Sequence, residues 1–170
     1  IPVWSSAKGQ DDLVWYGTQK NEDGIYELQV NVKDHKYSDG NYNIHAYITD
    51  ITGTQYFAGS TSCNMALEKG SLQVNKISDT QYSIVLSGLV IPGGTSEVLF
   101  PVWSENGGQD DLIWYSAKTD REGNYTYTLN LRDHKGLGKY NVHAYAKKRN
   151  GEQIPLLSTD FSTETPAINK

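Results

Sequence analysis

Two pairs of adjacent aspartates are the most obvious candidates for chemistry in this sequence. Asp11 and Asp12 follow a Gly-Gln pair, and Asp110 and Asp111 follow a second one. Paired carboxylates can act as the acid and base of a glycosidase or hold a hard cation. Neighbouring residues on a strand point to opposite faces, so adjacent side chains converge only within a turn. We therefore expect these aspartates to accept backbone N–H bonds at the start of a strand.

The four histidines form two pairs that could supply a metal site. His35 and His45 make one pair, and His134 and His143 make the other. Two histidines with a nearby aspartate are a donor set that zinc accepts. His35 follows an aspartate at the end of a predicted strand, whereas His45 lies within one. We expect His35 to close a turn through a hydrogen bond and His45 to lie on an outer sheet face, so the prediction is no metal and no cofactor.

An internal repeat organises the whole chain. All four Trp and all four His occupy matched positions, and a single one-residue deletion interrupts the alignment. The best matched segments are residues 2–5 with 101–104, 9–13 with 108–112, 34–36 with 133–135, and 45–47 with 143–145. Two homologous modules follow, and we place them at residues 1–67 and 68–170.

Alternation of apolar and polar residues with a period of two predicts strands throughout. It is clearest in residues 26–32 and 42–47 and in their counterparts. The pattern Gly-x-Tyr-x-Ile-x-Ala is typical of the sixth strand of an immunoglobulin-like sandwich, with Tyr42 as a tyrosine corner. For the second copy we expect seven strands, near 72–77, 81–90, 97–104, 110–118, 124–133, 139–147 and 152–162. The predicted fold is all-β, with two tandem immunoglobulin/fibronectin-like β-sandwich modules.

Residues 70–97 precede the second copy and have no counterpart in the first. They are predicted to form two strands joined by a turn. Their counterpart would lie before Ile1, so we expect a first module that lacks its N-terminal strands and a chain that is part of a longer array. We expect the hairpin to complete the second module, leaving the first to share strands with a neighbouring chain or to share this hairpin through a changed packing. The alternative is that the part common to both copies is a complete fold by itself, and that residues 70–97 are an inserted hairpin that serves both copies.

Composition excludes several classes of partner and site. The formal net charge is −5 and the basic residues are scattered, so we expect no nucleic-acid partner. No stretch approaches the roughly 18 consecutive apolar residues of a spanning helix, so we expect no membrane partner. The single cysteine, Cys63, excludes an intrachain disulfide framework. Because it aligns with Phe161, we expect it to be a small buried hydrophobic residue.

Aromatic residues give the remaining functional signal. Alternation assigns Trp15, Tyr26 and Tyr42 to the core, and it leaves Tyr16 and Tyr47 on more exposed faces. Exposed aromatic rings beside Asn, Asp, Gln and His are typical of a sugar-binding surface, although an aromatic cross-strand pair can also serve only to stabilise a sheet. The candidate ligand-binding residues are Asp11, Tyr16, His45, Tyr47, Asp110, Tyr115, His143 and Tyr145.

The repeated motif resembles a known family. Pro-Val-Trp-Ser, then Gly-Gln-Asp-Asp-Leu-x-Trp-Tyr, Asp-His-Lys and Gly-x-Tyr-Asn-x-His-Ala-Tyr are similar to the GBS Bsp-like repeat. Such repeats occur in tandem in secreted proteins of streptococci and related Gram-positive bacteria. The resemblance implies non-catalytic wall-attachment modules, which often accompany peptidoglycan hydrolase domains. It implies no individual ligand-contacting residue.

Three functional hypotheses follow. The leading one is a binding module that holds a secreted, cell-wall-associated protein, such as a peptidoglycan hydrolase, on peptidoglycan glycan or teichoic acid. The second is a structural spacer or adhesion module without its own ligand. The third is a metal-dependent hydrolase that uses the Asp and His residues. The outward sheet face distinguishes the binding module from the spacer. A binding module should carry the same cluster of exposed aromatic residues in both copies, whereas a spacer should carry none.

Overall fold

The computed structural model describes residues 1–163, which form strands, turns and two short 3-10 helices. The chain divides into two compact units. The first comprises Ile1–Leu67 together with Ile91–Gly94, and the second comprises Glu68–Val90 together with the chain from Thr95 on. Within the described residues no helix is long and apolar enough to cross a membrane.

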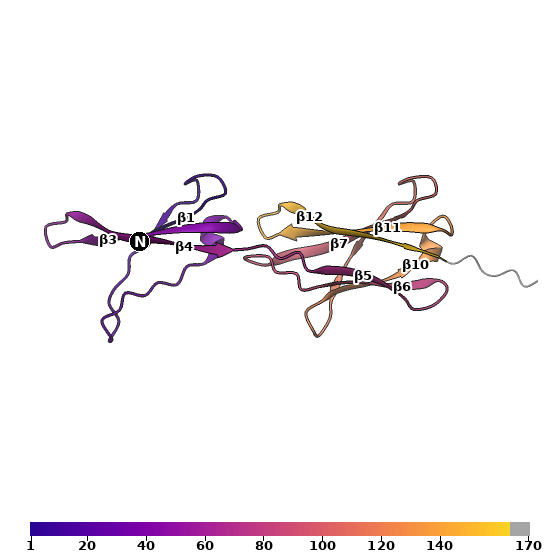
Figure 1. Ribbon diagram of the computed structural model, residues 1–170, viewed down its shortest axis with the longest axis horizontal. Helices are drawn as coiled ribbons and strands as arrows, with labels where there is room; N and C mark the ends of the chain where they lie inside the picture. Colours follow the sequence, from indigo (N-terminus) through magenta and orange to yellow (C-terminus); the bar gives the residue numbers. More distant parts are fainter. Residues whose placement is uncertain (164–170) are drawn as a thin grey trace, which may run out of the picture. The chain divides into compact units, whose positions relative to one another are not determined.

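The second unit is a sandwich of two four-stranded antiparallel sheets (Figure 1). One sheet has the order β5 (Ser71–Lys76), β6 (Gln81–Ser87), β10 (Tyr125–Asn130) and β9 (Lys118–Thr119). The other has the order β12 (Gln153–Ser162), β11 (Lys139–Lys148), β7 (Thr95–Ser104) and β8 (Ile113–Ser116). The predicted strands are confirmed with three corrections to their bounds. The segment 110–118 forms strand only from Ile113 on, and the segment 81–90 is strand only as far as Ser87. The segment 124–133 ends as a strand at Asn130, and Leu131–Asp133 form a 3-10 helix.

The core of the second unit lies between these sheets and consists of every other residue of the central strands. β6, β7, β10 and β11 all contribute side chains that are buried from solvent. They are Tyr82, Ile84, Leu86, Val98, Phe100, Val102, Leu129, Tyr140, Val142, Ala144 and Ala146. The alternation read from the sequence therefore places the core of the second unit correctly, and the β-sandwich prediction is confirmed.

The first unit contains a single four-stranded antiparallel sheet. Its order is β2 (Val14–Trp15), β1 (Pro2–Ser5), β3 (Gly40–Thr49) and β4 (Gln55–Met65). The strand expected over residues 26–32 is absent from it, and only an isolated bridge joins Lys20 to Tyr26. The counterpart of that segment, β10, pairs with β6, and the described residues of the first unit contain no second hairpin of that kind. Without a partner for its backbone groups, the segment does not become a strand.

Two core assignments in the first unit are wrong for the same reason. Tyr26 is 58% exposed, and Cys63 is exposed as well. In the second unit the residue that matches Cys63, Phe161, packs against Tyr82 of β6 with a ring separation of 4.4 Å. The first unit has no equivalent of β6 to cover these positions.

The predicted tyrosine corner is confirmed in both units. The Tyr42 hydroxyl is 2.8 Å from the Ser38 carbonyl oxygen, to which it donates a hydrogen bond. The Tyr140 hydroxyl donates to the carbonyl of Gly136. Both tyrosines are buried, and each bond ties the start of β3 or β11 to the loop before it.

Candidate ligand-binding face

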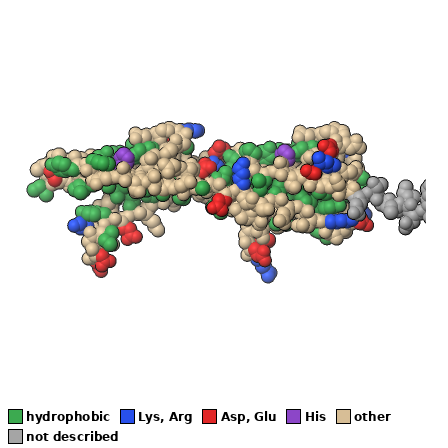
Figure 2. Space-filling model, in the orientation of Figure 1, with side chains coloured by type: hydrophobic (Ala, Val, Ile, Leu, Met, Phe, Trp, Pro, Cys, Tyr) green, Lys and Arg blue, Asp and Glu red, His purple; other side chains and the backbone are tan. Residues whose placement is uncertain are grey.

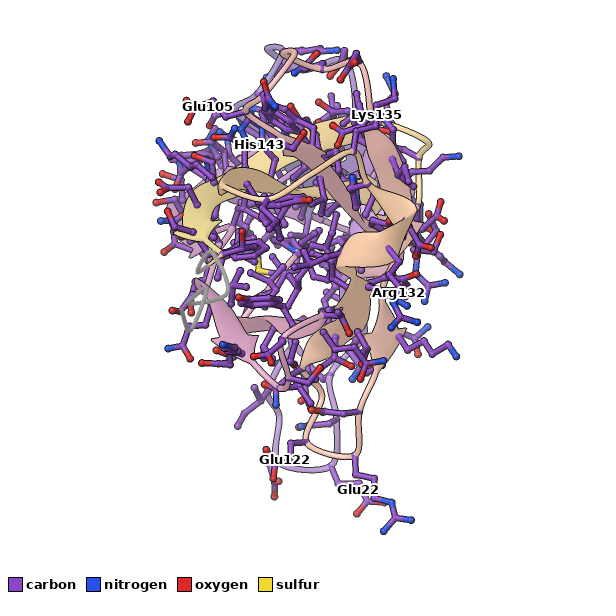
Figure 3. All side chains as sticks on the ribbon, turned by 90° about the vertical axis from the view of Figure 1, so that its right-hand side faces the viewer. Glu22, Glu105, Glu122, Arg132, Lys135 and His143 are labelled. Atoms are coloured by element: carbon purple, nitrogen blue, oxygen red, sulfur yellow. The ribbon has the colours of Figure 1, made fainter. Side chains whose placement is uncertain are left out.

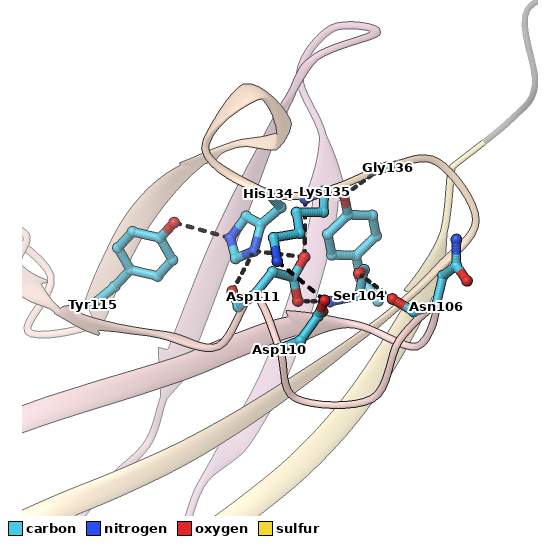
Figure 4. A network of polar contacts seen from close by, with 9 residues as sticks. Ser104, Asn106, Asp110, Asp111, Tyr115, His134, Lys135 and Gly136 are labelled. Carbon is cyan, nitrogen blue, oxygen red and sulfur yellow. Dashed lines mark hydrogen bonds and ion pairs between the residues drawn. The ribbon is translucent and has the colours of Figure 1, made fainter.

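The second aspartate of each pair is part of a buried polar network. Figure 4 shows the network around Asp111. Asp111 Oδ1 accepts the Ser104 N–H at 2.9 Å, and Oδ2 accepts the Lys135 N–H at 3.0 Å. Burial alone would raise the pKa of Asp111, but the hydrogen bonds from Lys135 and Ser104 outweigh it and lower the pKa. Asp12 accepts the Ser5 N–H in the same way, at 2.9 Å. The expected role as an acceptor of backbone N–H bonds is confirmed for Asp12 and Asp111 only, and the donors lie on other segments, so neither carboxylate caps its own turn.

A tyrosine and a histidine extend this network in both units. His134 Nε2 is 2.9 Å from the Tyr115 hydroxyl, and its Nδ1 is 3.1 Å from the Asp111 carbonyl oxygen. In the first unit His35 makes the corresponding bonds to Tyr16 and to the Asp12 carbonyl, both at 2.9 Å. Both histidines are buried, so the expected hydrogen-bonding role of His35 is confirmed.

The expected exposure of Tyr115 is wrong. Tyr115 is only 8% exposed, whereas its neighbour Trp114 is 46% exposed and Trp15 is 55% exposed. Trp15 therefore does not belong to the core, and Tyr16 is half-buried. The reason is that β2 and β8 begin one residue after the leucine of the motif, so alternation cannot be counted from that leucine. The hydrogen bond from the tyrosine hydroxyl to the buried histidine then holds the side chain of Tyr16 or Tyr115 on the inner side of the sheet.

The first aspartate of each pair is exposed and forms an ion pair with a lysine. Asp11 Oδ2 lies 2.9 Å from Lys36 Nζ, and Asp110 Oδ2 lies 3.1 Å from Lys135 Nζ. Each lysine directly follows the buried histidine, which is the last residue of the 3-10 turn Val32–His35 in the first unit and the residue after the turn Leu131–Asp133 in the second. These exposed pairs hold the loop before β2 or β8 against that turn, and each contributes little to stability.

The two histidines of each unit do not converge. The His35 ring contacts the Tyr42 ring on the inner side of the sheet, at 5.4 Å, whereas the His45 ring contacts Trp4, at 4.8 Å. Residues 44 and 46 on either side of His45 belong to the opposite face of β3. Among residues 1–163, no group of three or more His, Cys, Asp or Glu side chains could hold a metal ion.

The outer sheet face of the second unit carries a continuous row of rings. Trp103 lies 4.8 Å from His143, His143 lies 6.4 Å from Tyr145, and Tyr145 lies 5.3 Å from Trp114. These residues come from β7, β11 and β8. They are partly exposed, whereas the residues that alternate with them on β11 are buried. His143 points away from the interior of the sandwich in Figure 3.

The first unit repeats this arrangement. Trp4 lies 4.8 Å from His45, His45 lies 6.4 Å from Tyr47, and Tyr47 lies 5.4 Å from Trp15. Phe57 adds a fifth ring, 5.6 Å from both His45 and Tyr47. In each unit a histidine is visible among hydrophobic side chains at the surface (Figure 2). We call the four matched residues of each unit its aromatic face: Trp4, Trp15, His45 and Tyr47, and Trp103, Trp114, His143 and Tyr145.

A β-bulge at the same place in both units helps to form this face. The pairing of β3 with β4 shifts between Ala46 and Tyr47, and that of β11 with β12 shifts between Ala144 and Tyr145. A bulge redirects the side chains that follow it. Here it is followed by the tyrosine that joins the histidine to the outer tryptophan.

Polar side chains border the rings. Asn43 is the cross-strand partner of Trp4, and Asn141 is that of Trp103. Ser60 and Ser158 are the partners of His45 and His143. Cross-strand partners share a face, so each aromatic face has an amide and a hydroxyl beside it. Of the candidate residues, His45 lies beside Tyr47 in the first unit, and His143 lies beside Tyr145 in the second. The tryptophans that complete each face were not among the predicted site residues, although their exact repetition in the sequence was a signal.

The family is decided by a comparison with family models. The model of the GBS Bsp-like repeat matches residues 1–63 and again residues 71–161. The chain belongs to this family. No curated protein matches the sequence. The chain is therefore a tandem Bsp-like repeat with an all-β repeat fold.

Several solved structures are similar to this Bsp-like tandem. A polysaccharide deacetylase from Bacillus cereus shares 20% identity with a TM-score of 0.46, over 58% of this chain and 31% of that one. A tetra-tandem repeat from the extending region of a large adhesion protein shares 20% identity with a TM-score of 0.46, over 96% and 40%. A stretch of titin domains shares 14% identity with a TM-score of 0.40, over 96% and 54%. The chain thus spans less than two thirds of each of these structures.

Proposed function

We propose that each Bsp-like unit binds a glycan of the bacterial cell wall through its aromatic face, and that the tandem holds a secreted, wall-associated protein in place. The observation that carries the proposal is the repetition of the face, with ring separations of 4.8 and 6.4 Å in both units. A spacer needs no such cluster at its surface. A binder that uses both units needs it twice.

The chemistry of the face suits a sugar. Sugar rings have apolar C–H faces that stack on aromatic rings, and they have hydroxyls that exchange hydrogen bonds with amide and hydroxyl groups. Trp15 and Trp114 are the most exposed members of the two faces, so a ligand can cover them without unfolding the sheet. The neighbouring Asn and Ser side chains supply donors and acceptors within the same strands.

The charge on the outer face favours a neutral glycan over teichoic acid. In the sheet β1–β4, the outward positions of each strand can be assigned from the cross-strand partners of the aromatic face. They are Pro2, Trp4, Trp15, Asn41, Asn43, His45, Tyr47, Thr49, Gln55, Phe57, Ser60, Ser62 and Asn64. None of these strand positions is acidic, Lys or Arg. On the outer face of the second unit, Lys139 and Lys147 of β11 are accompanied by Asp160 opposite Asn141 and Glu97 opposite Lys147, so these four charges cancel. Neither face therefore has an excess of cations for a polyanion, and peptidoglycan glycan is the ligand we propose.

Two weak sites on one chain are sufficient for retention. When one unit is bound, the second unit is held near the wall at a high effective concentration, so its binding becomes intramolecular. Overall retention can then exceed the affinity of either unit without any additional contact. This is why both aromatic faces should contribute on a polymeric wall.

The test is a sedimentation assay of the purified chain with intact cell walls and with walls stripped of teichoic acid. We expect retention on both. Replacing Trp114 and Tyr145 together with Ala should weaken retention about tenfold or more, because stacking on one aromatic side chain is typically worth about 1–3 kcal/mol. The matched pair in the first unit, Trp15→Ala with Tyr47→Ala, should do the same.

Tyr26→Ala is the control, since Tyr26 is an exposed aromatic residue outside the aromatic face. It should leave retention unchanged. Unaltered retention of a folded chain that carries all four substitutions would contradict the proposal. Retention that disappears with teichoic acid would identify that polymer as the ligand, and a native chain retained on neither wall would favour the spacer.

A further inference from the structure

The histidine of each aromatic face differs from the buried histidine of the same unit in its hydrogen bonds. Both ring nitrogens of His134 have protein partners, the Tyr115 hydroxyl and the Asp111 carbonyl oxygen. Within the described part of the chain, the ring nitrogens of His45 and His143 have no hydrogen-bond partner. They are not among the buried polar atoms that lack a partner, so a ligand can reach them. Each aromatic face therefore presents an imidazole that the fold does not use for hydrogen bonding.

An asparagine lies beside each of these histidines. Asn141 and His143 are two residues apart on β11, so they point to the same face with about 6.6 Å between their Cα atoms. Asn43 and His45 have the same arrangement on β3. Asn43 Nδ2 donates a hydrogen bond of 2.8 Å to Ser6 Oγ, which leaves the amide oxygen Oδ1 as an acceptor for a ligand. Each pair thus offers an imidazole N–H as a donor and an amide oxygen as an acceptor.

A tryptophan completes the group in each unit. Trp103 is the cross-strand partner of Asn141, and its ring lies 4.8 Å from that of His143. The first unit repeats this arrangement with the same ring distance of 4.8 Å. All of these side chains are half-buried. We call the three residues of each unit its triad: Trp4, Asn43 and His45, and Trp103, Asn141 and His143.

We propose that each triad recognises the acetamido group of an N-acetylated sugar. The inference rests on the proposed function and names the chemical group by which the glycan is recognised. An acetamide is planar and trans, so its N–H and C=O point in opposite directions. The N–H donates to the asparagine Oδ1, and the C=O accepts from the histidine N–H. A group that donates at one edge and accepts at the other fits between two side chains that share a face two residues apart.

The methyl group of the acetamide accounts for the tryptophan. In a trans amide the carbon bonded to the carbonyl lies on the N–H side, so the methyl is directed toward the asparagine. The tryptophan is the cross-strand partner of that asparagine and offers the methyl an apolar ring. Outside the triads the units differ, because Ser62 is the other partner of Asn43 and Asp160 is that of Asn141. The triad is thus the part of the site that both units can use in the same way.

The experiment compares two neutral tetrasaccharides with the same backbone linkage by isothermal titration calorimetry on the whole chain. Tetra-N-acetylchitotetraose carries acetamido groups, and cellotetraose carries hydroxyls in their place. We expect the acetylated tetrasaccharide to bind at least about tenfold more tightly, because only an acetamide can bridge both side chains. Replacing His45 and His143 together with Phe keeps the rings and removes their nitrogens. The preference for the acetylated tetrasaccharide should then shrink about three- to tenfold.

Tyr47→Phe with Tyr145→Phe is the matched control, because it removes the tyrosine hydroxyls from the same faces and leaves both triads intact. This variant should keep the preference of the native chain. Equal affinities of the native chain for the two tetrasaccharides would overturn the inference, and so would a full preference in the folded His45→Phe, His143→Phe variant. Wall retention is measured in parallel. Retention without a preference would refute the acetamide inference alone, whereas a chain that binds neither the walls nor the tetrasaccharides would refute the proposed function as well.

Discussion

Tyr115→Phe is the sharpest test of the division between a structural network and a binding face. The substitution removes one hydroxyl and keeps the ring that stacks on Tyr127 at 4.4 Å. The lost group is the partner of His134 Nε2, at 2.9 Å, in a buried setting. If Tyr115 is structural, the change lowers stability and leaves wall retention alone.

The magnitude follows from burial. A typical hydrogen bond contributes about 0.5–1.5 kcal/mol, and leaving a buried partner unsatisfied costs about 1–3 kcal/mol. We therefore expect Tyr115→Phe to lower the free energy of unfolding of the second unit by about 1–3 kcal/mol. Tyr16→Phe is the matched variant, with the same 2.9 Å bond to His35 in a more open setting. Water can replace that hydroxyl, so the loss there should stay below about 1 kcal/mol.

Urea unfolding gives the stabilities, and amide exchange of residues 140–145 assigns the loss to the second unit. Retention on cell walls is measured for the same variants. Equal losses for Tyr115→Phe and Tyr16→Phe would show that burial does not set the cost. A Tyr115→Phe variant with native stability and weakened retention would show that Tyr115 contacts the ligand, and it would refute the assignment of a structural role to this residue.

Three further predictions concern stability. Burial, followed by the charge of Asp12, raises the pKa of Tyr42 to about 12, above the usual value of about 10. Because the folded-state pKa is the higher one, the stability that this group contributes is complete below about pH 10 and should fall as the pH rises to about 12, which phenolate absorbance and urea midpoints can follow. Amide exchange should be slower in residues 140–145 than in 42–47, because only the second unit has an opposing sheet; equal protection in a monomer would contradict this. Gly70→Ala should destabilise the β5–β6 hairpin, since Gly70 has a φ of +74° and a Cβ there would lie 2.0 Å from the Ser87 carbonyl oxygen; a thermal melt unaltered by the change would show that the turn adapts.

The sequence was sufficient to predict the fold of the second unit because the signals there are local and agree. Period-two alternation located the strands, and the tyrosine corner indicated how β11 meets its preceding loop. The same signals failed for residues 26–32, where alternation is equally clear but no partner strand is present. Strand formation depends on pairing as well as on pattern, and pairing cannot be read from the segment itself.

The candidate site was predicted in part. His45, Tyr47, His143 and Tyr145 were assigned to an outer face, and they do lie together there. The tryptophans were not included, because alternation counted from the motif leucine assigned Trp15 to the core. That leucine lies before the strand begins, so its position carries no information about which face follows. The exposure of the tryptophans depends on where a two-residue or four-residue strand starts, which local patterns do not specify.

The aromatic face of each unit forms independently of the opposite, inner face of its sheet. In the first unit the inner face is open, yet the outer rings have the same spacing as in the second unit, with 5.4 Å between Trp15 and Tyr47 against 5.3 Å between Trp114 and Tyr145. The spacing therefore follows from strand pairing and from the shared bulge, and it does not need the opposing sheet. Glycan binding by the first unit should consequently not require an opposing sheet, and the aromatic faces of the two units should contribute comparably to retention on cell walls. Retention that falls with Trp114→Ala and Tyr145→Ala but not with Trp15→Ala and Tyr47→Ala would contradict this, because it would show that the aromatic face needs the opposing sheet.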